Sequence, residues 1–277
     1  MRDTLKLCLV QMTSAAGYAA NIATMQTAVD TAADANCDLV AFPEVAGLMN
    51  RNAEVARMLV GKAEHDPFIT ACKTAARDRE IWLHTGSTPV LGPDGRFLNH
   101  STLIDDSGEV RASYDKIHLF DAVIDGQKPI GESKRFAPGI DAVIARTPWG
   151  KWGLTICYDL RFPALYRDYA HAGAGIIFVP SAFTVPTGKA HWQTLLQARA
   201  IENGVWIIAP AQVGTHEDGR QTWGHSMVVD PWGNVVLDMG GTETGTSIIE
   251  LDLALIAKSR AQIPSLEHDR EYAIRVL

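Results

Sequence analysis

Residues 153–163 read Gly-Leu-Thr-Ile-Cys-Tyr-Asp-Leu-Arg-Phe-Pro. The apolar first half of this stretch is typical of a buried strand, and Cys157 stands where the strand gives way to polar residues. Pro163 then begins a helix-like segment, at a position where the missing N–H of proline costs least. A turn between strand and helix can expose a thiol and aim main-chain N–H groups at a developing oxyanion. A cysteine used only for packing is expected inside the strand, so we interpret Cys157 as a nucleophile.

The same succession of strands, turns and helices extends to both sides of this stretch. Apolar and β-branched runs predict strands, and apolar residues at helical spacing predict helices. The expected strands are residues 5–12, 39–42, 81–85, 98–105, 109–116, 142–146, 152–157, 175–179, 205–209, 226–230, 235–238 and 247–251, and the expected helices are residues 22–33, 67–80, 163–171 and 191–203. Since no linker or shift in composition interrupts this order, we expect one α/β domain over residues 1–277, with a mixed sheet or paired sheets. The more charged residues 264–277 suit an arm that reaches another subunit.

Composition and charge exclude several classes of protein. About half of the 277 residues are apolar, so a large core can form without a metal or disulfides. The net charge is −7 and no Lys/Arg-rich run occurs, which argues against a nucleic-acid surface. No window approaches about 18 uninterrupted apolar residues, and the first residues resemble a strand more than a signal peptide, so we expect neither a membrane span nor export.

Cysteine usage agrees with a reduced, cytoplasmic setting. The four cysteines, Cys8, Cys37, Cys72 and Cys157, form no C-x-x-C pair. The first three lie in or beside apolar or helix-like segments, where a cysteine usually acts as a small buried hydrophobe.

Two other segments end an apolar run on a reactive side chain. Leu-Val-Ala-Phe-Pro-Glu ends at Glu44, and Tyr-Asp-Lys-Ile-His carries Lys116 after a strand. Taken singly, Glu44 is better explained as a solvated loop carboxylate and Lys116 as a surface lysine. Together with Cys157, however, a glutamate can take the thiol proton and activate water, while an ammonium stabilises a tetrahedral oxyanion. The three residue types are sufficient for amide hydrolysis through a thioester.

In this order, the three segments resemble the Glu–Lys–Cys signature of the nitrilase superfamily. Further matching segments lie at residues 180–183, 187–192, 197–203 and 224–233, so the resemblance spans essentially the whole chain. It implies a four-layer α-β-β-α sandwich that assembles into a homodimer or a higher homo-oligomer. It also implies Glu44 as general base, Lys116 as oxyanion stabiliser and Cys157 as nucleophile.

The resemblance assigns supporting residues as well. A second glutamate that hydrogen-bonds to the lysine is best matched by Glu132 in Gly-Glu-Ser, and the main-chain N–H of Tyr158 completes the oxyanion hole. Arg161 suits the clamping of a substrate carboxylate, with a structural pairing to Asp159 or another acid as the alternative. The other residues expected against the substrate are Phe183, Thr184 and His191.

Within the superfamily the sequence is most similar to the branch that contains deaminated-glutathione amidase and ω-amidase. We therefore expect a small-molecule amide substrate that carries a carboxylate. Residues 181–183 and 211–216 favour deaminated glutathione, and ω-amides such as α-ketoglutaramate are the alternative. Lys189 departs from the Gly-Pro-Ala-His of the branch and alters the charge expected at the pocket rim. An alternative of another class is a catalytically silent interaction protein, against which the presence of all three reactive residues argues.

The sequence gives no reason to expect a metal or a cofactor. It contains neither the H-E-x-x-H pattern of zinc hydrolases nor a glycine-rich phosphate loop after a strand. His118, His191 and His225 raise the alternative of a Cys–His pair. Because the resemblance puts the base on Glu44, structural hydrogen bonding is the better interpretation of these histidines.

Overall fold

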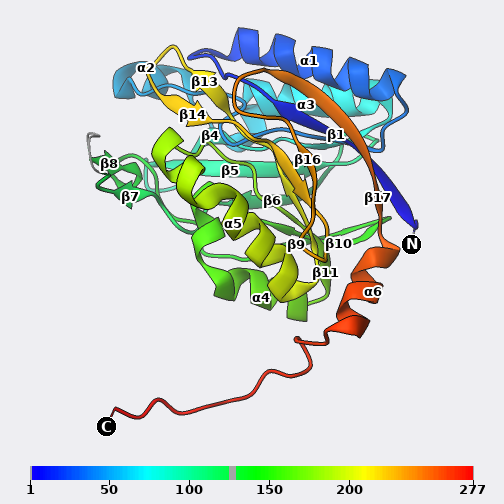
Figure 1. The fold of residues 1–277 in the computed structure, drawn as a ribbon. Coiled ribbons are helices and arrows are strands. Elements are labelled where there is room, and N and C mark those ends of the chain that lie inside the picture. Colours follow the sequence, from blue (N-terminus) through cyan, green and yellow to red (C-terminus); the bar gives the residue numbers. More distant parts are fainter. Residues whose placement is uncertain (1, 125–128, 277) are drawn as a thin grey trace.

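Two β-sheets pack face to face between two layers of helices in the computed structural model, which describes residues 2–124 and 129–276 (Figure 1). Figure 1 shows α1 (Tyr18–Asp34) and α3 (Pro67–Arg79) on one side of the sheets, and α4 (Pro163–His171) and α5 (Val185–Asn203) on the other. The expected four-layer α-β-β-α sandwich is therefore confirmed.

The first sheet has the strand order β17-β1-β2-β3-β5-β4, with β6 paired to β5. Its strands are β1 (Thr4–Gln11), β2 (Leu39–Ala41), β3 (Trp82–His84), β4 (Thr88–Leu91), β5 (Phe97–Ile104), β6 (Val110–Asp115) and β17 (Gly245–Asp252). The neighbours β1, β2 and β3 are parallel, and all other pairs in this sheet are antiparallel.

The second sheet has the order β16-β15-β12-β11-β10-β9, in which β10, β11 and β12 are parallel. Its strands are β9 (Val143–Thr147), β10 (Gly150–Leu154), β11 (Ala174–Phe178), β12 (Trp206–Ala209), β15 (Met227–Val229) and β16 (Val235–Asp238). Two small hairpin-like pairs complete the strands: β7 (Asp121–Ala122) with β8 (Ile130–Gly131), and β13 (Val213–Thr215) with β14 (Gln221–Trp223).

Helix boundaries follow local capping chemistry. The carboxylate of Asp66 accepts from the N–H of Ile69 at 2.9 Å and so caps α3, which has a proline in its first turn. Helix α5 also has a proline in its first turn and begins at Val185. The predicted start of this helix, six residues later, was wrong because polar residues hide the helical period in its first turns. The remaining helices are α2 (Ala53–Leu59), α6 (Ala254–Gln262), and the 3₁₀ turns η1 (Ala63–His65), η2 (Glu132–Lys134) and η3 (Cys157–Arg161).

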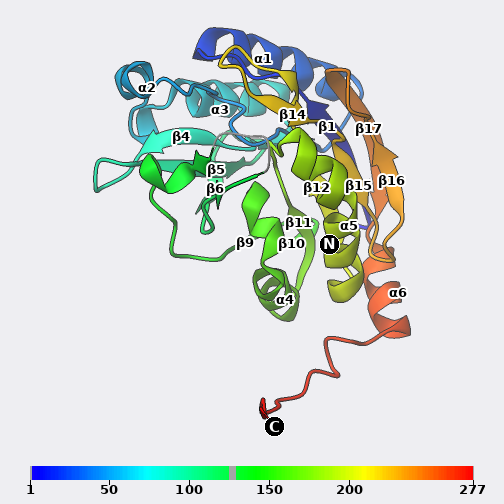
Figure 2. The same cartoon turned by 60° about the vertical axis from the view of Figure 1, so that its left-hand side comes forward.

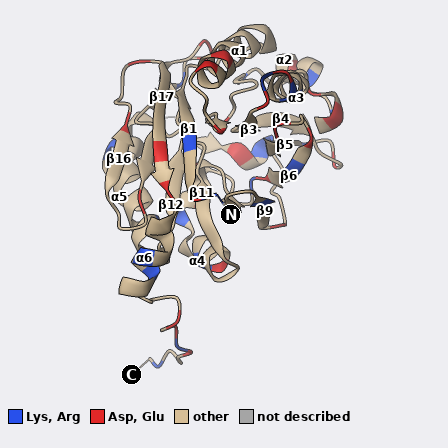
Figure 3. Cartoon of the chain, turned by 90° about the vertical axis from the view of Figure 1, so that its right-hand side faces the viewer, with Lys and Arg blue, Asp and Glu red and all other residues tan. Residues whose placement is uncertain are grey.

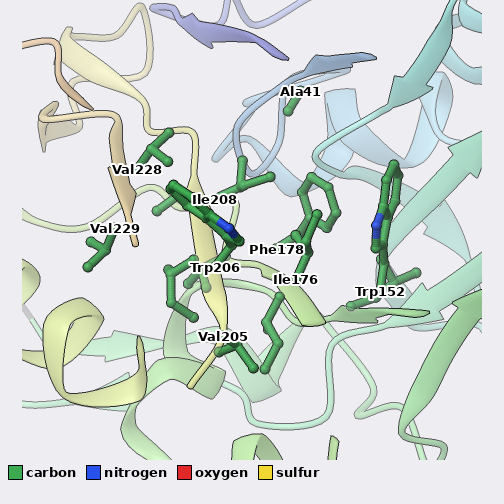
Figure 4. Close-up of a cluster of buried hydrophobic side chains, with 14 of the residues drawn as sticks. Ala41, Trp152, Ile176, Phe178, Val205, Trp206, Ile208, Val228 and Val229 are labelled. Carbon is green, nitrogen blue, oxygen red and sulfur yellow. The ribbon is translucent and has the colours of Figure 1, made fainter. Parts of the chain in front are cut away.

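Strand β1 divides its side chains between two cores. Leu5, Leu7 and Leu9 point between the sheets, while Cys8 and Val10 pack under α1 and α3. This alternation follows from the two-residue period of a strand that is covered on both faces. Figure 4 shows part of the core between the sheets, where the ring centroids of Trp152 and Phe178 lie 5.4 Å apart. Burial of each such side chain stabilises the fold by roughly 1.5–3 kcal/mol.

The surface and the chain end carry few specialised features. Figure 3 shows acidic and basic residues spread over many helices, strands and loops of the ribbon. Within residues 2–124 and 129–276, none of the helices combines the length and the apolar character that a membrane span needs. Beyond α6 the chain leaves the body in an extended path (Figure 2), and Tyr272 and Ile274 are exposed there.

As expected, Cys8, Cys37 and Cys72 are buried unpaired thiols.

Candidate active site

Four predicted site residues come from four different loops and meet at one buried point. Glu44 lies three residues after β2, Lys116 directly follows β6, Glu132 begins η2, and Cys157 begins η3. Glu44 and Lys116 thus extend from the first sheet, and Cys157 extends from β10 of the second. The meeting point therefore depends on the packing of one sheet against the other.

Glu44, Lys116 and Glu132 form what we call the charged cluster. The Lys116 Nζ lies 2.8 Å from Glu44 Oε1, and 2.9 Å and 3.1 Å from Glu132 Oε2 and Oε1. Glu132 also accepts from the main-chain N–H of Phe120 at 2.6 Å. The lysine is almost completely buried, and two carboxylates on one ammonium leave the cluster with one net negative charge.

These contacts keep Lys116 protonated. Burial alone would lower the pKa of its ammonium, but the adjacent carboxylates of Glu132 and Glu44 raise this pKa well above its ordinary value. Lys116 therefore cannot act as a base at neutral pH. It is suited to donate a charge-assisted hydrogen bond to an oxyanion.

Cys157 occupies a strained turn and does not end the strand as predicted. Strand β10 stops at Leu154, and Cys157 has a φ of +50°, in the left-handed region that non-glycine residues rarely adopt. The thiol is also less exposed than predicted, since Cys157 is 7 % exposed. Strained backbone of this kind clusters at functional sites, where the surrounding structure enforces it.

Asp159 holds this turn against the loop that carries Lys116. Its buried carboxylate accepts from Tyr114 Oη at 2.7 Å, Ile156 N at 2.8 Å and His118 N at 3.0 Å, and His118 Nδ1 lies 2.7 Å away. The alternative pairing of Asp159 with Arg161 is therefore not adopted. The expectation that His118 makes structural hydrogen bonds is confirmed.

The thiol of Cys157 is protonated in this environment. Burial and the charge of Glu44 raise its pKa well above the ordinary value, and the ammonium of Lys116 and the N–H of Ala182 offset only part of this rise. A nucleophile of this kind needs a base at the moment of attack. The carboxylate of Glu44 is next to the thiol, in a position that suits such a base.

Main-chain N–H groups near the thiol differ in their availability. Cys157 N donates to Pro180 O at 3.0 Å, and Asp159 N donates to Ile156 O at 3.1 Å. Between them, the N–H of Tyr158 has no acceptor among the residues that the structure describes. This N–H is therefore available to donate, and it is the one that the family resemblance assigns to the oxyanion hole.

Cys157 lines a narrow pocket of about 20 Å³ that opens to solvent. Its walls include four predicted substrate-binding residues, Tyr158, Arg161, Phe183 and Thr184. The guanidinium of Arg161 lies over the rings of Tyr158 and Phe183 and makes no ion pair within the described residues. An unpaired cation beside a nucleophile suits an anionic substrate.

His191 lies outside this pocket. Its Nδ1 is 3.2 Å from Arg161 Nη2, and its ring lines a larger cavity of about 330 Å³ along α5 that also contains Trp223 and His225. The larger cavity holds no member of the charged cluster and no thiol. The reactive groups therefore point to the smaller pocket as the site.

Several contacts of the site were missed by the sequence analysis. Asn99 on β5 donates to Glu44 Oε1 at 2.9 Å, and Ala182 N donates to Glu44 Oε2 at 2.9 Å. The one available signal for Asn99 was an amide on the buried face of an alternating strand. The N–H of Ala182 carries no signal in the sequence, because every residue except proline has one.

Comparisons with known proteins identify the family of this chain. The family profile "Carbon-nitrogen hydrolase" matches residues 6–261. A deaminated glutathione amidase of Synechocystis sp. is 38% identical over 94% of this chain and 96% of the relative, and that of Mus musculus is 38% identical over 95% of this chain and 83% of the relative.

Solved structures give the same result for the fold. The Caenorhabditis elegans NitFhit protein superposes with a TM-score of 0.89 at 35% identity, covering 97% of this chain and 65% of that longer protein. Saccharomyces cerevisiae Nit3, described as a member of branch 10 of the nitrilase superfamily, superposes with a TM-score of 0.85 at 28% identity, covering 95% of this chain and 96% of Nit3.

Proposed function

From the premise that the chain belongs to the carbon-nitrogen hydrolase family, we propose that it hydrolyses a small carboxylate-bearing amide through a thioester on Cys157. The observation that carries this proposal is the convergence of the charged cluster on the buried thiol of Cys157. That arrangement supplies a nucleophile, a base and an oxyanion donor within one water-poor site.

In the first half of the reaction, Cys157 Sγ attacks the amide carbonyl carbon and its proton passes to Glu44. The resulting oxyanion accepts hydrogen bonds from the Lys116 ammonium and the Tyr158 N–H. As the C–N bond breaks, Glu44 returns the proton to the leaving nitrogen, and the acyl group remains on sulfur as a thioester. Glu132 also accepts from the Lys116 ammonium at 2.9 Å and helps to keep it charged.

In the second half, Glu44 takes a proton from water, and the hydroxide oxygen attacks the thioester carbon. The oxyanion again forms beside Lys116 and collapses with cleavage of the C–S bond. Cys157 recovers its proton from Glu44, and the carboxylic acid leaves. No step needs a metal or a cofactor.

We propose deaminated glutathione as the substrate. The relatives at 38% identity that carry this name match almost the whole chain, which supports the assignment. Arg161 makes no ion pair among the described residues and lines the same pocket as Cys157, so it is suited to a substrate carboxylate. Tyr158, Phe183 and Thr184 are further walls, and His191 acts through its contact with Arg161. ω-Amides such as α-ketoglutaramate are the second candidate, because they share the 2-oxo acid end.

The deciding experiment compares kcat/KM for deaminated glutathione and α-ketoglutaramate on one preparation by mass spectrometry. A preference of about 100-fold for deaminated glutathione, which corresponds to roughly 2.7 kcal/mol of transition-state binding, supports the proposed substrate. A reverse preference makes the protein an ω-amidase. Turnover of neither compound refutes both substrates and directs the search to carbamoyl and simple aliphatic amides.

Selective alkylation separates an enzyme from a silent interaction protein. Iodoacetamide should modify Cys157 ahead of the other three cysteines, because Glu44 can take its proton during attack. Burial raises the pKa of Cys8 to about 12, and burial together with the charge of Asp66 raises the pKa of Cys72 well above its ordinary value. Equal, slow modification of all four thiols contradicts an activated nucleophile.

We also propose a cytoplasmic homodimer or higher homo-oligomer. Four unpaired cysteines suit a reducing compartment. Arg167 anchors Ser265 and Asp269, after which the chain runs outward with Tyr272 and Ile274 exposed, as an arm for a second subunit would. Light scattering should find an oligomer for the full chain and a smaller species after truncation at Asp269; a monomeric full chain refutes this assembly.

A further inference from the structure

Asn99 contacts every member of the charged cluster. It lies on β5 and is 2 % exposed. Its Nδ2 is 2.9 Å from Glu44 Oε1 and 3.4 Å from Glu132 Oε1, and its main-chain oxygen accepts from Lys116 N at 3.0 Å. One residue of the first sheet thereby fixes the backbone of the lysine and the side chains of both glutamates.

The orientation of the Asn99 amide follows from these neighbours. Ionised carboxylates only accept hydrogen bonds, so the NH₂ group must face Glu44 and Glu132. The carbonyl oxygen Oδ1 is then left buried without a hydrogen-bond partner among the described residues. An unpaired buried acceptor is unfavourable, and a residue selected for packing would not retain it. We therefore attribute the presence of the Asn99 amide to the contacts of its NH₂ group with the two carboxylates.

The two oxygens of Glu44 differ because of this contact. Each carboxylate oxygen has about two lone-pair sites. On Oε1, Lys116 Nζ and Asn99 Nδ2 occupy both sites, whereas Oε2 accepts a hydrogen bond from Ala182 N alone among residues 2–124 and 129–276. The open site for a proton is therefore on Oε2. We propose that Asn99 is a positioning residue that directs the proton of Cys157 to Oε2 of Glu44, an inference that rests on the proposed role of Glu44 as base.

The test compares two alanine variants on the same strand. Asn99→Ala removes the donor to Glu44 but keeps the main-chain carbonyl that holds Lys116. Ser101→Ala is the matched control: Ser101 is buried on the same face of β5, with its Oγ 3.3 Å from His84 Nε2, and it makes no contact with the charged cluster. Asn99→Asp has the same side-chain shape, so the role of Asn99 can still be tested if the alanine variant fails to fold.

We expect Asn99→Ala to lower kcat about 10-fold or more while KM changes less than about 3-fold. The acid limb of the kcat/KM pH profile should move to higher pH, because Glu44 loses a hydrogen bond that favours its ionised form. The charged and titratable groups facing Glu44, namely Lys116, Glu132 and Cys157, are unchanged in this variant. Asn99→Asp adds a third carboxylate and should lose more activity as pH rises. Ser101→Ala should stay within about 2-fold of the parent.

A purely structural role for Asn99 predicts a different result. If Asn99→Ala keeps kcat within about 2-fold, or if its acid limb stays at the parental pH, the positioning role is overturned. Full activity of Asn99→Asp across the pH range overturns it as well. Glu44→Gln separates the two proposals: if it is inactive while Asn99→Ala is normal, only the Asn99 inference fails. Parental activity of Glu44→Gln removes the proposed base and the inference together.

Discussion

Substitution of Asp159 by asparagine should destabilise the turn that carries Cys157. The variant keeps the side-chain shape but replaces one acceptor oxygen by an NH₂ group. If this group faces Ile156 and Tyr114, the N–H of Ile156 loses its acceptor; if it faces His118, the N–H of His118 does. In either orientation, one main-chain donor that is buried (Ile156) or partly buried (His118) is left without this acceptor.

The expected loss follows from these contacts. One unsatisfied buried donor costs about 1–3 kcal/mol, and the loss of negative charge weakens the remaining hydrogen bonds by about 1 kcal/mol each. The neutral amide is easier to bury, which offsets part of this sum and leaves about 3 kcal/mol. For a chain of this size the melting temperature should fall by about 6–12 °C.

The assay is thermal unfolding followed by circular dichroism, together with kcat measured well below the transition. Tyr114→Phe is the graded control, because it leaves the Asp159 carboxylate in place and removes the hydrogen bond from Tyr114 Oη to it, together with the longer one that Oη accepts from Ile117 N at 3.3 Å. It should lower Tm by about half as much. Turnover should fall in Asp159→Asn, since the turn also carries the nucleophile. A Tm within about 2 °C of the parent refutes the view that this carboxylate holds the turn.

Three other substitutions test the site from different sides. Lys116→Ala should lower kcat by about 10²-fold or more in steady-state assays, the usual effect of losing an oxyanion donor, and near-normal turnover would remove its role. Arg161→Ala should raise KM for an acidic substrate but not for its ester, and unchanged discrimination between the two would refute the carboxylate clamp. Gly86→Ala should lower Tm by about 4 °C or more, because Gly86 has a φ of +67° and a Cβ there would overlap the main-chain oxygen of Pro43, next to Glu44. A parental Tm would show that this loop can shift to accept the methyl group.

Much of the site was accessible from the sequence because reactive residues follow apolar strands. The runs that end near Glu44, Lys116 and Cys157 predicted strands, and the structure brings their loops together with Glu132. The helix over residues 163–171 was predicted with the observed bounds, since Pro163 marks its first turn. The catalytic roles remain predictions that the experiments above address.

What the sequence did not predict depends on backbone conformation and on distant contacts. The positive φ of Cys157 has no sequence signal, so the strand before it was extended three residues too far. Asn99 meets Glu44 across 55 residues and Glu132 across 33, and only the folded sheets bring these atoms together. Helices α2 and α6 were not predicted, because neither short segment has a clear apolar period.

The most direct test of the mechanism is identification of the residue that carries the acyl group during turnover. The enzyme is mixed with its amide substrate, quenched in acid within milliseconds, and mapped by peptide mass spectrometry. The mechanism predicts the acyl mass on Cys157, with neither adduct nor turnover in Cys157→Ala. An acyl group on another residue, or parental turnover by Cys157→Ala, would contradict it.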